Sequence, residues 1–280
     1  MNKNVMVTVL ITAYNEEEKI ERCIDSILGQ SFSDFEILII NDGSTDNTDT
    51  IIRNIIKKKD INHKIRYINR ENCGRILSLN EGIFLAKGKY IAIQDADDYS
   101  LKDRLLKQVE FLENNSDIDI LGTAYIRYDS IRNEKYIRRY PLEDKQIKQE
   151  MCKYIPICQG SMMLKTNLIK SVGGYNTKCK DAEDLDLWLR LGNNVKFANL
   201  SEPYYVYDLT LSNSFFHSNY KTWERNYRVF KLNCKAIKVF SLSKLNYIYA
   251  LARLIYPYIP TNLKKIIRNR CSKIQEKDIN

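Results

Sequence analysis

The first hundred residues alternate between two hydrophobic periods. Nearly continuous apolar runs, typical of buried strands, occupy residues 5–11, 35–40, 65–68 and 90–93. Apolar side chains spaced three and four positions apart, typical of amphipathic helices, occupy residues 20–28, 51–56 and 76–86. Such alternation predicts an α/β fold with a mostly parallel sheet covered by helices on both faces. Further on, we expect helices near 105–112 and 183–191 and an extended segment at 118–128.

Length and composition limit the kind of protein this can be. With 280 residues, 44% of them apolar, the chain has enough material for a sizeable core. The longest apolar run is shorter than the ~18 residues of a membrane-spanning helix. The run at 5–11 precedes acidic residues and no cleavage site, so we interpret it as a strand and not as a signal peptide. Seven cysteines without a C-x-x-C pair, and only two histidines, favour reduced cytosolic thiols over disulfides or a zinc site.

Positive charge is concentrated at one end of the chain. Residues 218–280 contain 14 Lys and Arg against three acidic residues, a net charge of +11, whereas residues 1–217 carry a net charge of −2. This division predicts a near-neutral folded domain over 1–217 and a basic tail over 218–280. Such a tail suits a polyanion, either an anionic lipid surface or nucleic acid.

The tail also has a helical hydrophobic period. Apolar residues spaced by four and three positions are Trp223, Tyr227, Phe230, Cys234 and Ile237. A second apolar segment with tyrosines follows at 245–256. Two interpretations stay open, and they are compatible: an interfacial membrane segment, or a helical appendage that packs its apolar face on the body.

Carboxylates follow the fourth predicted strand. Asp95, Asp97 and Asp98 stand within four residues, directly after a buried run. Crowded carboxylates at a strand end suit a hard divalent cation with oxygen ligands. The alternative is a solvated acidic turn that caps the next helix.

Two other polar segments invite a functional interpretation. Asp42 follows the second strand and could accept a hydrogen bond from a base or a ribose, although a helix-capping role is the alternative. The sequence has no glycine-rich loop of the kind that binds phosphate groups. Glu183 and Asp184 open a predicted helix, where they either favour the helix dipole or supply a general base.

These segments together resemble family 2 glycosyltransferases of GT-A fold. The motifs that carry the resemblance, over roughly residues 5–215, are VLITAYNE at 9–16, IINDGSTD at 39–46, NCG at 72–74, LNEG at 79–82, GKYIAIQDADD at 88–98, GGY at 173–175 and ED at 183–184. The resemblance does not cover the tail.

The resemblance implies roles for individual residues. It assigns contact with the nucleotide to Thr12, Ala13, Tyr14, Glu16, Asp42, Gly74, Asn80 and Asp95, with Arg75 beside them although it has no fixed counterpart. It implies that Asp95 and Asp97 bind a divalent metal, Mn²⁺ or Mg²⁺, and that Asp184 is the catalytic base, with Glu183 beside it.

The implied activity is an inverting transfer of a sugar from a nucleotide-diphosphate sugar, UDP-linked, to a hydroxyl of a glycan or lipid-linked acceptor in surface polysaccharide synthesis. The implied location is cytoplasmic and peripheral, at the inner face of the cell membrane. The sequence departs from the family at two places where histidines are common. Thr210 stands where the Y-R-x-H pattern has its histidine, and Gln159 stands in the segment before Gly160-Ser161 where another histidine is common. His217 is near enough in sequence to substitute.

Two other functions fit parts of the sequence. A nucleotidyltransferase acting on sugar phosphates also pairs a sheet with metal-binding carboxylates, but it needs a basic, glycine-rich loop where residues 12–18 are acidic. A nucleic-acid-binding protein would use the basic tail, but it would also place positive charge on the body. We expect no nucleic-acid partner.

Overall fold

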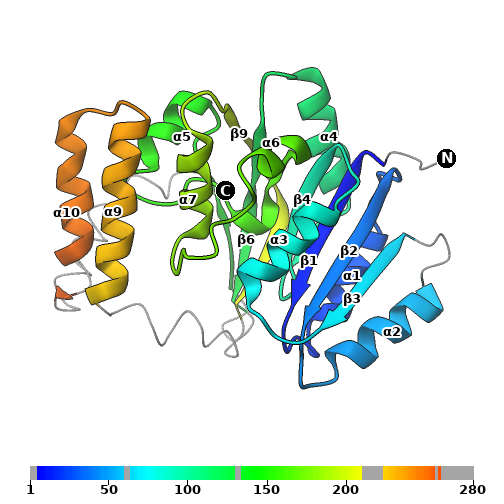
Figure 1. The fold of residues 1–280 in the computed structure, drawn as a ribbon. Helices are drawn as coiled ribbons and strands as arrows, with labels where there is room; N and C mark the ends of the chain where they lie inside the picture. The colour runs from blue at the N-terminus through cyan, green and yellow to red at the C-terminus, as the bar shows by residue number, and fades with distance from the viewer. Residues whose placement is uncertain (1–4, 60–63, 130–133, 210–222, 256–257, 260–280) are drawn as a thin grey trace.

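Within the described residues, the fold is built around a nine-stranded sheet (Figure 1). The computed structural model describes residues 5–59, 64–129, 134–209, 223–255 and 258–259. The first four strands are parallel neighbours, in the order β3, β2, β1, β4. Their bounds are Val7–Ala13 for β1, Phe35–Asp42 for β2, Ile65–Arg70 for β3 and Tyr90–Asp95 for β4. All four were predicted from continuous apolar runs.

The second half of the chain extends the sheet with mixed pairing. The order continues β4, β8, β6, β9, β5, and β7 pairs with β6. Strand β8 is antiparallel to β4 and β6, whereas β6 and β9 are parallel. The bounds are Tyr99–Ser100 for β5, Ile120–Asp129 for β6, Glu134–Arg138 for β7, Met163–Lys165 for β8 and Phe197–Leu209 for β9.

Helices cover both faces of the sheet, as predicted. One face packs against α1 (Ile20–Leu28), α2 (Thr48–Lys59) and α4 (Arg104–Asn114). The opposite face packs against α3 (Arg75–Leu85), α5 (Asp144–Glu150), α6 (Thr166–Ser171) and α7 (Glu183–Leu191). A short 3-10 turn, η1 (Gln159–Ser161), precedes β8. Alternate residues of β1 serve the two faces, since Val9 joins the first cluster and Leu10 the second.

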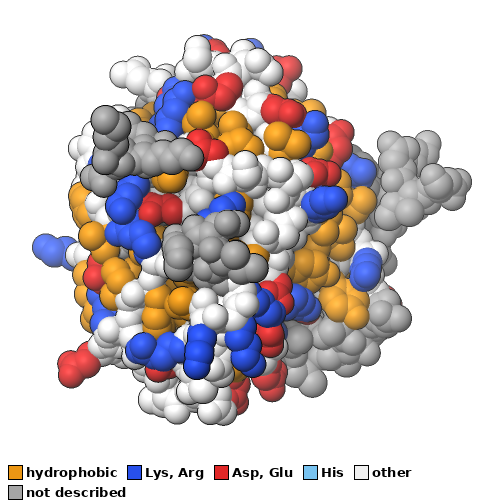
Figure 2. Space-filling view, turned by 90° about the vertical axis from the view of Figure 1, so that its right-hand side faces the viewer, with side chains coloured by type: hydrophobic (Ala, Val, Ile, Leu, Met, Phe, Trp, Pro, Cys, Tyr) orange, Lys and Arg blue, Asp and Glu red, His pale blue; other side chains and the backbone are white. Residues whose placement is uncertain are grey.

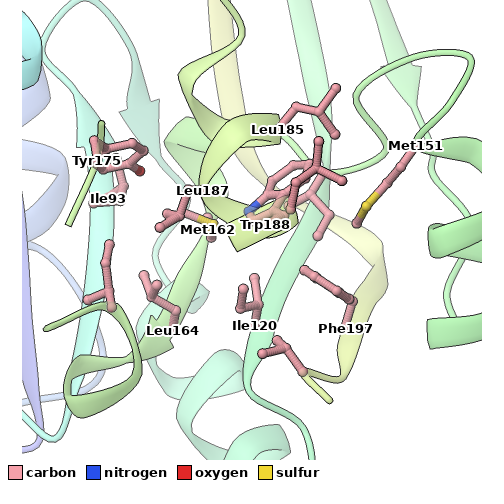
Figure 3. Packing of buried hydrophobic residues seen from close by; sticks show 14 of the residues in the cluster. Ile93, Ile120, Met151, Met162, Leu164, Tyr175, Leu185, Leu187, Trp188 and Phe197 are labelled. Atoms are coloured by element: carbon pink, nitrogen blue, oxygen red, sulfur yellow. The ribbon is translucent and has the colours of Figure 1, made fainter. Parts of the chain in front are cut away.

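The core beside α7 centres on Trp188, which is fully buried. Its indole meets the ring of Phe197 edge to face, with ring centroids 6.0 Å apart. Figure 3 shows Leu185, Leu187 and Met162 around the same indole. This packing fixes the helix that begins at Glu183 against the sheet.

Two C-terminal helices pack on this core. They are α9 (Trp223–Val239) and α10 (Tyr247–Ile255), joined through the short turn η2 (Lys244–Asn246). Ala236, Ile237 and Ala250 belong to the same buried cluster as Trp188. The described part of the tail therefore packs on the body as a helical appendage, which is one of the two interpretations that the sequence leaves open.

Ion pairs also join α9 to the body. Arg225 and Arg228 pair with Asp181, at N–O distances of 3.2 and 2.6 Å. The predicted division at residue 217, and His217 itself, lie outside the described residues. Among the residues that the structure describes, no helix is long and apolar enough to cross a membrane.

The surface of the N-terminal half carries charges of both signs. Figure 2 shows Lys and Arg interspersed with Asp and Glu on the side of the molecule where α2 and β3 lie. This mixture agrees with the small net charge of residues 1–217.

The packing of α7 gives a stability prediction. Trp188→Ala should lower the free energy of unfolding by about 3–5 kcal/mol, because the indole is completely buried and its removal leaves a cavity in the core. Trp188→Phe should lower it less. Urea denaturation followed by circular dichroism measures both values, and equal losses would contradict this account of the core.

Candidate active site

The ends of three parallel strands bring the predicted loops together. In the sheet register, Thr12 lies beside Asp95 of β4, and Ala13 beside Asn41 of β2. Asp42 ends β2 beside Arg70 of β3. The segments that follow β1, β2 and β4 therefore meet at one edge, as expected for ligand sites in open α/β sheets.

The loops after β1 and β2 hold each other. The Asn15 amide N–H donates to Ser44 Oγ at 2.9 Å, and the Thr45 amide N–H donates to Asn15 Oδ1 at 2.8 Å. Asn15 is in the left-handed region, with φ of 55°. Tyr14, beside it, is 49% exposed at this edge. The first loop is thus fixed in backbone while it offers an aromatic ring to a ligand.

Asp42 organises the loop before α3. Its buried carboxylate accepts hydrogen bonds from the amides of Cys73 at 3.0 Å and Gly74 at 2.8 Å, and it pairs with Arg70. The cap of α2 is made by Asp46, whose Oδ1 accepts from the Thr48 amide at 3.0 Å. Asp42 therefore does not cap α2, and its carboxylate lies at the strand edge beside the predicted nucleotide loop.

Arg75 is the central contact of the site. Its Nη2 lies 2.7 Å from Asp95 Oδ1, and its Nη1 lies 2.7 Å from Glu183 Oε1. The guanidinium thereby links the end of β4 to the start of α7. This side chain is 41% exposed, so the bridge lies in the open edge of the site.

The loop after β4 is anchored by its last aspartate. Asp98 is buried and accepts hydrogen bonds from the Tyr205 hydroxyl at 2.8 Å and the Asp208 amide at 2.9 Å. Burial, together with the negative charges of Asp97 and Asp95, raises the pKa of Asp98. Asp98 therefore holds the loop and leaves Asp95 and Asp97 as the carboxylates that can serve a ligand.

Negative charge extends from this loop to the loop after β1. The pKa of Glu16 is raised to about 7 by burial and by the charge of Asp97, with Asp46 and Asp95 adding to it. Among the described residues, no three His, Cys, Asp or Glu side chains are arranged as a complete protein-only metal site. The pair of Asp95 and Asp97 nevertheless suits Mg²⁺ or Mn²⁺, since such ions are commonly held by one or two carboxylates with substrate phosphates. A divalent cation here would relieve the repulsion that raises the pKa of Glu16.

Glu183 and Asp184 occupy the first turn of α7, as predicted. Asp184 is 8% exposed, and its Oδ1 accepts the Leu185 amide N–H at 2.7 Å. Burial and the neighbouring Glu183 charge raise the pKa of Asp184 to about 7. Ala182, just before them, is in the left-handed region with φ of 52°, a strained conformation often found at functional sites. A carboxyl with this pKa can exchange a proton near neutral pH.

Asn80 is buried and binds the backbone of the loop that follows α6. Its amide holds both backbone groups of Tyr175, with distances of 2.8 Å to the carbonyl and 2.7 Å from the N–H. Gly174 has φ of 73°, and a Cβ there would collide with Asn80 Oδ1. Asn80 thus positions the loop before α7, while its predicted contact with a nucleotide stays a prediction.

Sequence reasoning missed several residues that shape the site. Tyr205 reaches Asp98 from β9, and a Cβ at Gly160 would collide with both the Tyr205 hydroxyl and the Asp95 carboxylate. Arg22 of α1 pairs with Asp208. The only sequence signal was indirect, in the departures from the family pattern around Gly160 and after Tyr207.

Comparison with known proteins identifies relatives of this chain. The profile of glycosyl transferase family 2 matches residues 8–173. A putative glycosyltransferase of Bacillus subtilis, EpsE, is 33% identical over 211 residues, which cover 73% of each chain. An uncharacterized glycosyltransferase of Methanocaldococcus jannaschii is 35% identical over 203 residues, 70% of this chain and 68% of that one. The hyaluronan synthase of Pasteurella multocida is 30% identical over 206 residues, which are 73% of this chain but 20% of the synthase.

Solved structures share the fold. S. aureus TarS 1–349 in complex with UDP-GlcNAc matches with a TM-score of 0.70 and 20% identity, covering 97% of this chain and 76% of that one. A mannosyltransferase of Pyrobaculum calidifontis in complex with GDP-Man and Mn²⁺ matches with a TM-score of 0.61 and 16% identity, covering 99% and 82%. The predicted GT-A fold is confirmed.

The buried Asp184 gives a stability prediction with a defined pH dependence. The folded state binds the Asp184 proton more tightly than the unfolded state, so the wild type loses stability as pH rises from about 4 to about 7. Asp184→Asn should therefore raise the free energy of unfolding by about 1–3 kcal/mol at pH 8. The gain should be smaller at pH 5. Thermal unfolding at both pH values measures it, and a variant destabilised equally at both would contradict the placement of a costly charge here.

Proposed function

The chain belongs to glycosyl transferase family 2 and is a glycosyltransferase, and we propose that it transfers a sugar from a UDP-sugar to a hydroxyl of a glycan or lipid-linked acceptor, with inversion. The proposed setting is surface polysaccharide synthesis. The family assignment favours this reaction over the nucleotidyltransferase and nucleic-acid-binding alternatives.

One observation carries the proposal. The guanidinium of Arg75 pairs with Asp95, at the end of β4, and with Glu183, at the start of α7, each at 2.7 Å. Asp184, adjacent to Glu183, is buried and has a pKa of about 7. One arginine therefore connects Asp95, on the donor side, to Glu183, the neighbour of the candidate base Asp184.

The inverting step needs a base and no protein nucleophile. Asp184, when ionised, accepts the proton of the acceptor hydroxyl as that oxygen attacks the anomeric carbon from the face opposite the leaving group. Burial keeps water from competing for the carboxylate. Glu183 and Arg75 orient the turn that carries Asp184, and the Leu185 amide fixes its Oδ1.

Asp95 and Asp97 would hold the divalent metal, Mn²⁺ or Mg²⁺. When bound, it offsets charge on the leaving nucleoside diphosphate. Asp98 keeps the loop in place through Tyr205. Among the described residues, Asp95 and Asp97 are the side chains at this edge that suit the cation.

The nucleoside would lie across the loops after β1 and β2. Tyr14 offers an exposed ring for the base, and the fixed loop of Thr12, Ala13 and Glu16 borders it. Asp42 and Gly74 form the adjacent wall. The TarS structure that shares this fold contains UDP-GlcNAc and the mannosyltransferase contains GDP-Man, so a hydrolysis screen over both nucleosides decides the donor.

We further propose that α10 attaches the enzyme to the inner face of the cell membrane. Large apolar side chains on α10 and just before it are half or more exposed: Leu245, Ile248, Tyr249, Leu251 and Ile255. Residues 223–255 carry seven Lys and Arg against Glu224 alone. Exposed apolar side chains with an excess of cations fit an anionic lipid surface.

The base role predicts a selective loss in Asp184→Asn. Single-turnover transfer should fall by ~10²-fold or more with donor affinity nearly unchanged, because only proton abstraction is lost. In the wild type, kcat/KM should rise as pH passes through about 7, since the base must be ionised. Glu183→Gln is the matched control and should lose less. Near-normal transfer by Asp184→Asn would remove it from the mechanism.

The metal role predicts that Asp97→Ala abolishes metal-dependent transfer and weakens donor binding. Asp103→Ala, an exposed acid eight residues after Asp95, should have little effect. Titration with Mn²⁺ and Mg²⁺ in both variants tests this. Undiminished sugar transfer by the wild type in the presence of a metal chelator would contradict the metal role.

The membrane role predicts that Ile248→Glu with Leu251→Glu reduces sedimentation with phosphatidylglycerol vesicles about tenfold or more, while donor hydrolysis is retained. Phe84→Glu is the control, because Phe84 is also exposed but lies on α3. The proposal would be refuted if the α10 double variant bound the vesicles as well as the wild type. Equal binding of the wild type to neutral phosphatidylcholine vesicles would also refute it.

A further inference from the structure

Four half-buried tyrosines form a continuous row beside the proposed active site. Tyr207 and Tyr125 have ring centroids 6.0 Å apart, and so have Tyr125 and Tyr140. Tyr140 stacks on Tyr154 at 6.4 Å. The row joins β9 and β6 to the segments that follow β7 and α5, so its members come from four separate parts of the chain.

The inner end of the row lies at the carboxylate loop. Tyr205 and Tyr207 point to the same side of β9, two residues apart, and the Tyr205 hydroxyl donates to Asp98. Tyr125 pairs with Tyr205 across β6 and β9, which places it on that side as well. Burial and the charges of the Asp95–Asp98 loop raise the pKa of Tyr207, in keeping with this proximity.

The segment before β8 lies between Tyr205, which neighbours the row on β9, and Tyr175, on the side of α7. Gly160 lies against both Tyr205 and Asp95, and the Gln159 amide donates to the Tyr175 hydroxyl at 3.2 Å. Tyr175 precedes the loop that leads to Glu183 and Asp184. This segment therefore connects Tyr205, the strand neighbour of the row, to the loop that leads to α7.

The outer end of the row carries a cation and a route toward α10. The Arg138 guanidinium lies 5.7 Å from the Tyr140 ring centroid and 5.9 Å from that of Tyr154. Lys153, next to Tyr154, lies 4.9 Å from the Tyr249 ring of α10. The row thus extends from the carboxylate loop toward the exposed face of α10.

We propose that the row of Tyr207, Tyr125, Tyr140 and Tyr154 binds the saccharide part of the acceptor and selects it. This rests on the proposed transferase function. Tyrosine rings give apolar surface to the C–H groups of a sugar and phenolic hydroxyls to its O–H groups, which is the mixture that a saccharide requires. Rings fixed against one another lose little conformational entropy on binding.

The test uses the full chain with UDP and Mn²⁺ on an array of immobilised oligosaccharides. Tyr140→Ala and Tyr154→Ala should lose about tenfold or more of the binding of the wild type, while donor hydrolysis and donor KM stay within twofold. Tyr154→Phe should retain most binding, because it keeps the ring. Tyr136→Ala is the matched control, since Tyr136 lies on the neighbouring strand β7 and stacks with Arg127 outside the row.

Each outcome decides the proposal. If the alanine variants are misfolded by circular dichroism, Tyr154→Leu, which keeps apolar bulk without the ring, takes their place. Unchanged array binding in the folded row variants overturns the assignment, and so does a wild-type chain that hydrolyses donor but binds no saccharide. A wild-type chain that hydrolyses no nucleotide sugar instead overturns the function on which the assignment rests.

Discussion

The contact of Arg75 with two carboxylates sets the geometry on which the rest of the site depends. Asp95 belongs to the end of β4, Glu183 to the start of α7, and Arg75 to the start of α3, so one guanidinium fixes three elements relative to one another. An exposed ion pair contributes little to folding stability. Its value here is positional, since it connects the loop after β4 to the turn that carries the candidate base Asp184.

The fold supports this contact from both sides. Parallel strands bring Thr12, Asp42 and Asp95 to one edge, and Asp42 fixes the amides just before Arg75. On the other side, Trp188 anchors α7 in the core. Destabilising features, namely the left-handed backbone of Ala182 and the buried carboxyl of Asp184, occur where the chemistry is proposed. This is expected when stability is exchanged for function.

Much of this could be predicted from the sequence, because hydrophobic period is a local signal. The four parallel strands, the helix at Glu183–Leu191 and the carboxylate loop followed from runs of a few residues. The contact of Tyr205 with Asp98 spans 107 residues, and that of Arg75 with Glu183 spans 108, so only the folded topology reveals them. The contact of the Asn80 amide with Tyr175 spans 95 residues and was likewise not foreseen from its motif.

The positional role of Arg75 is tested most directly by a double-mutant cycle with Arg75→Met and Glu183→Gln, measured as single-turnover sugar transfer. If the arginine holds the two carboxylates in place, each single change slows transfer. The fold-loss of rate in the double variant is then smaller than the product of the two single fold-losses. The expected coupling is about 1 kcal/mol or more. Effects that simply multiply would contradict the account, because they would mean that Arg75 and Glu183 act independently.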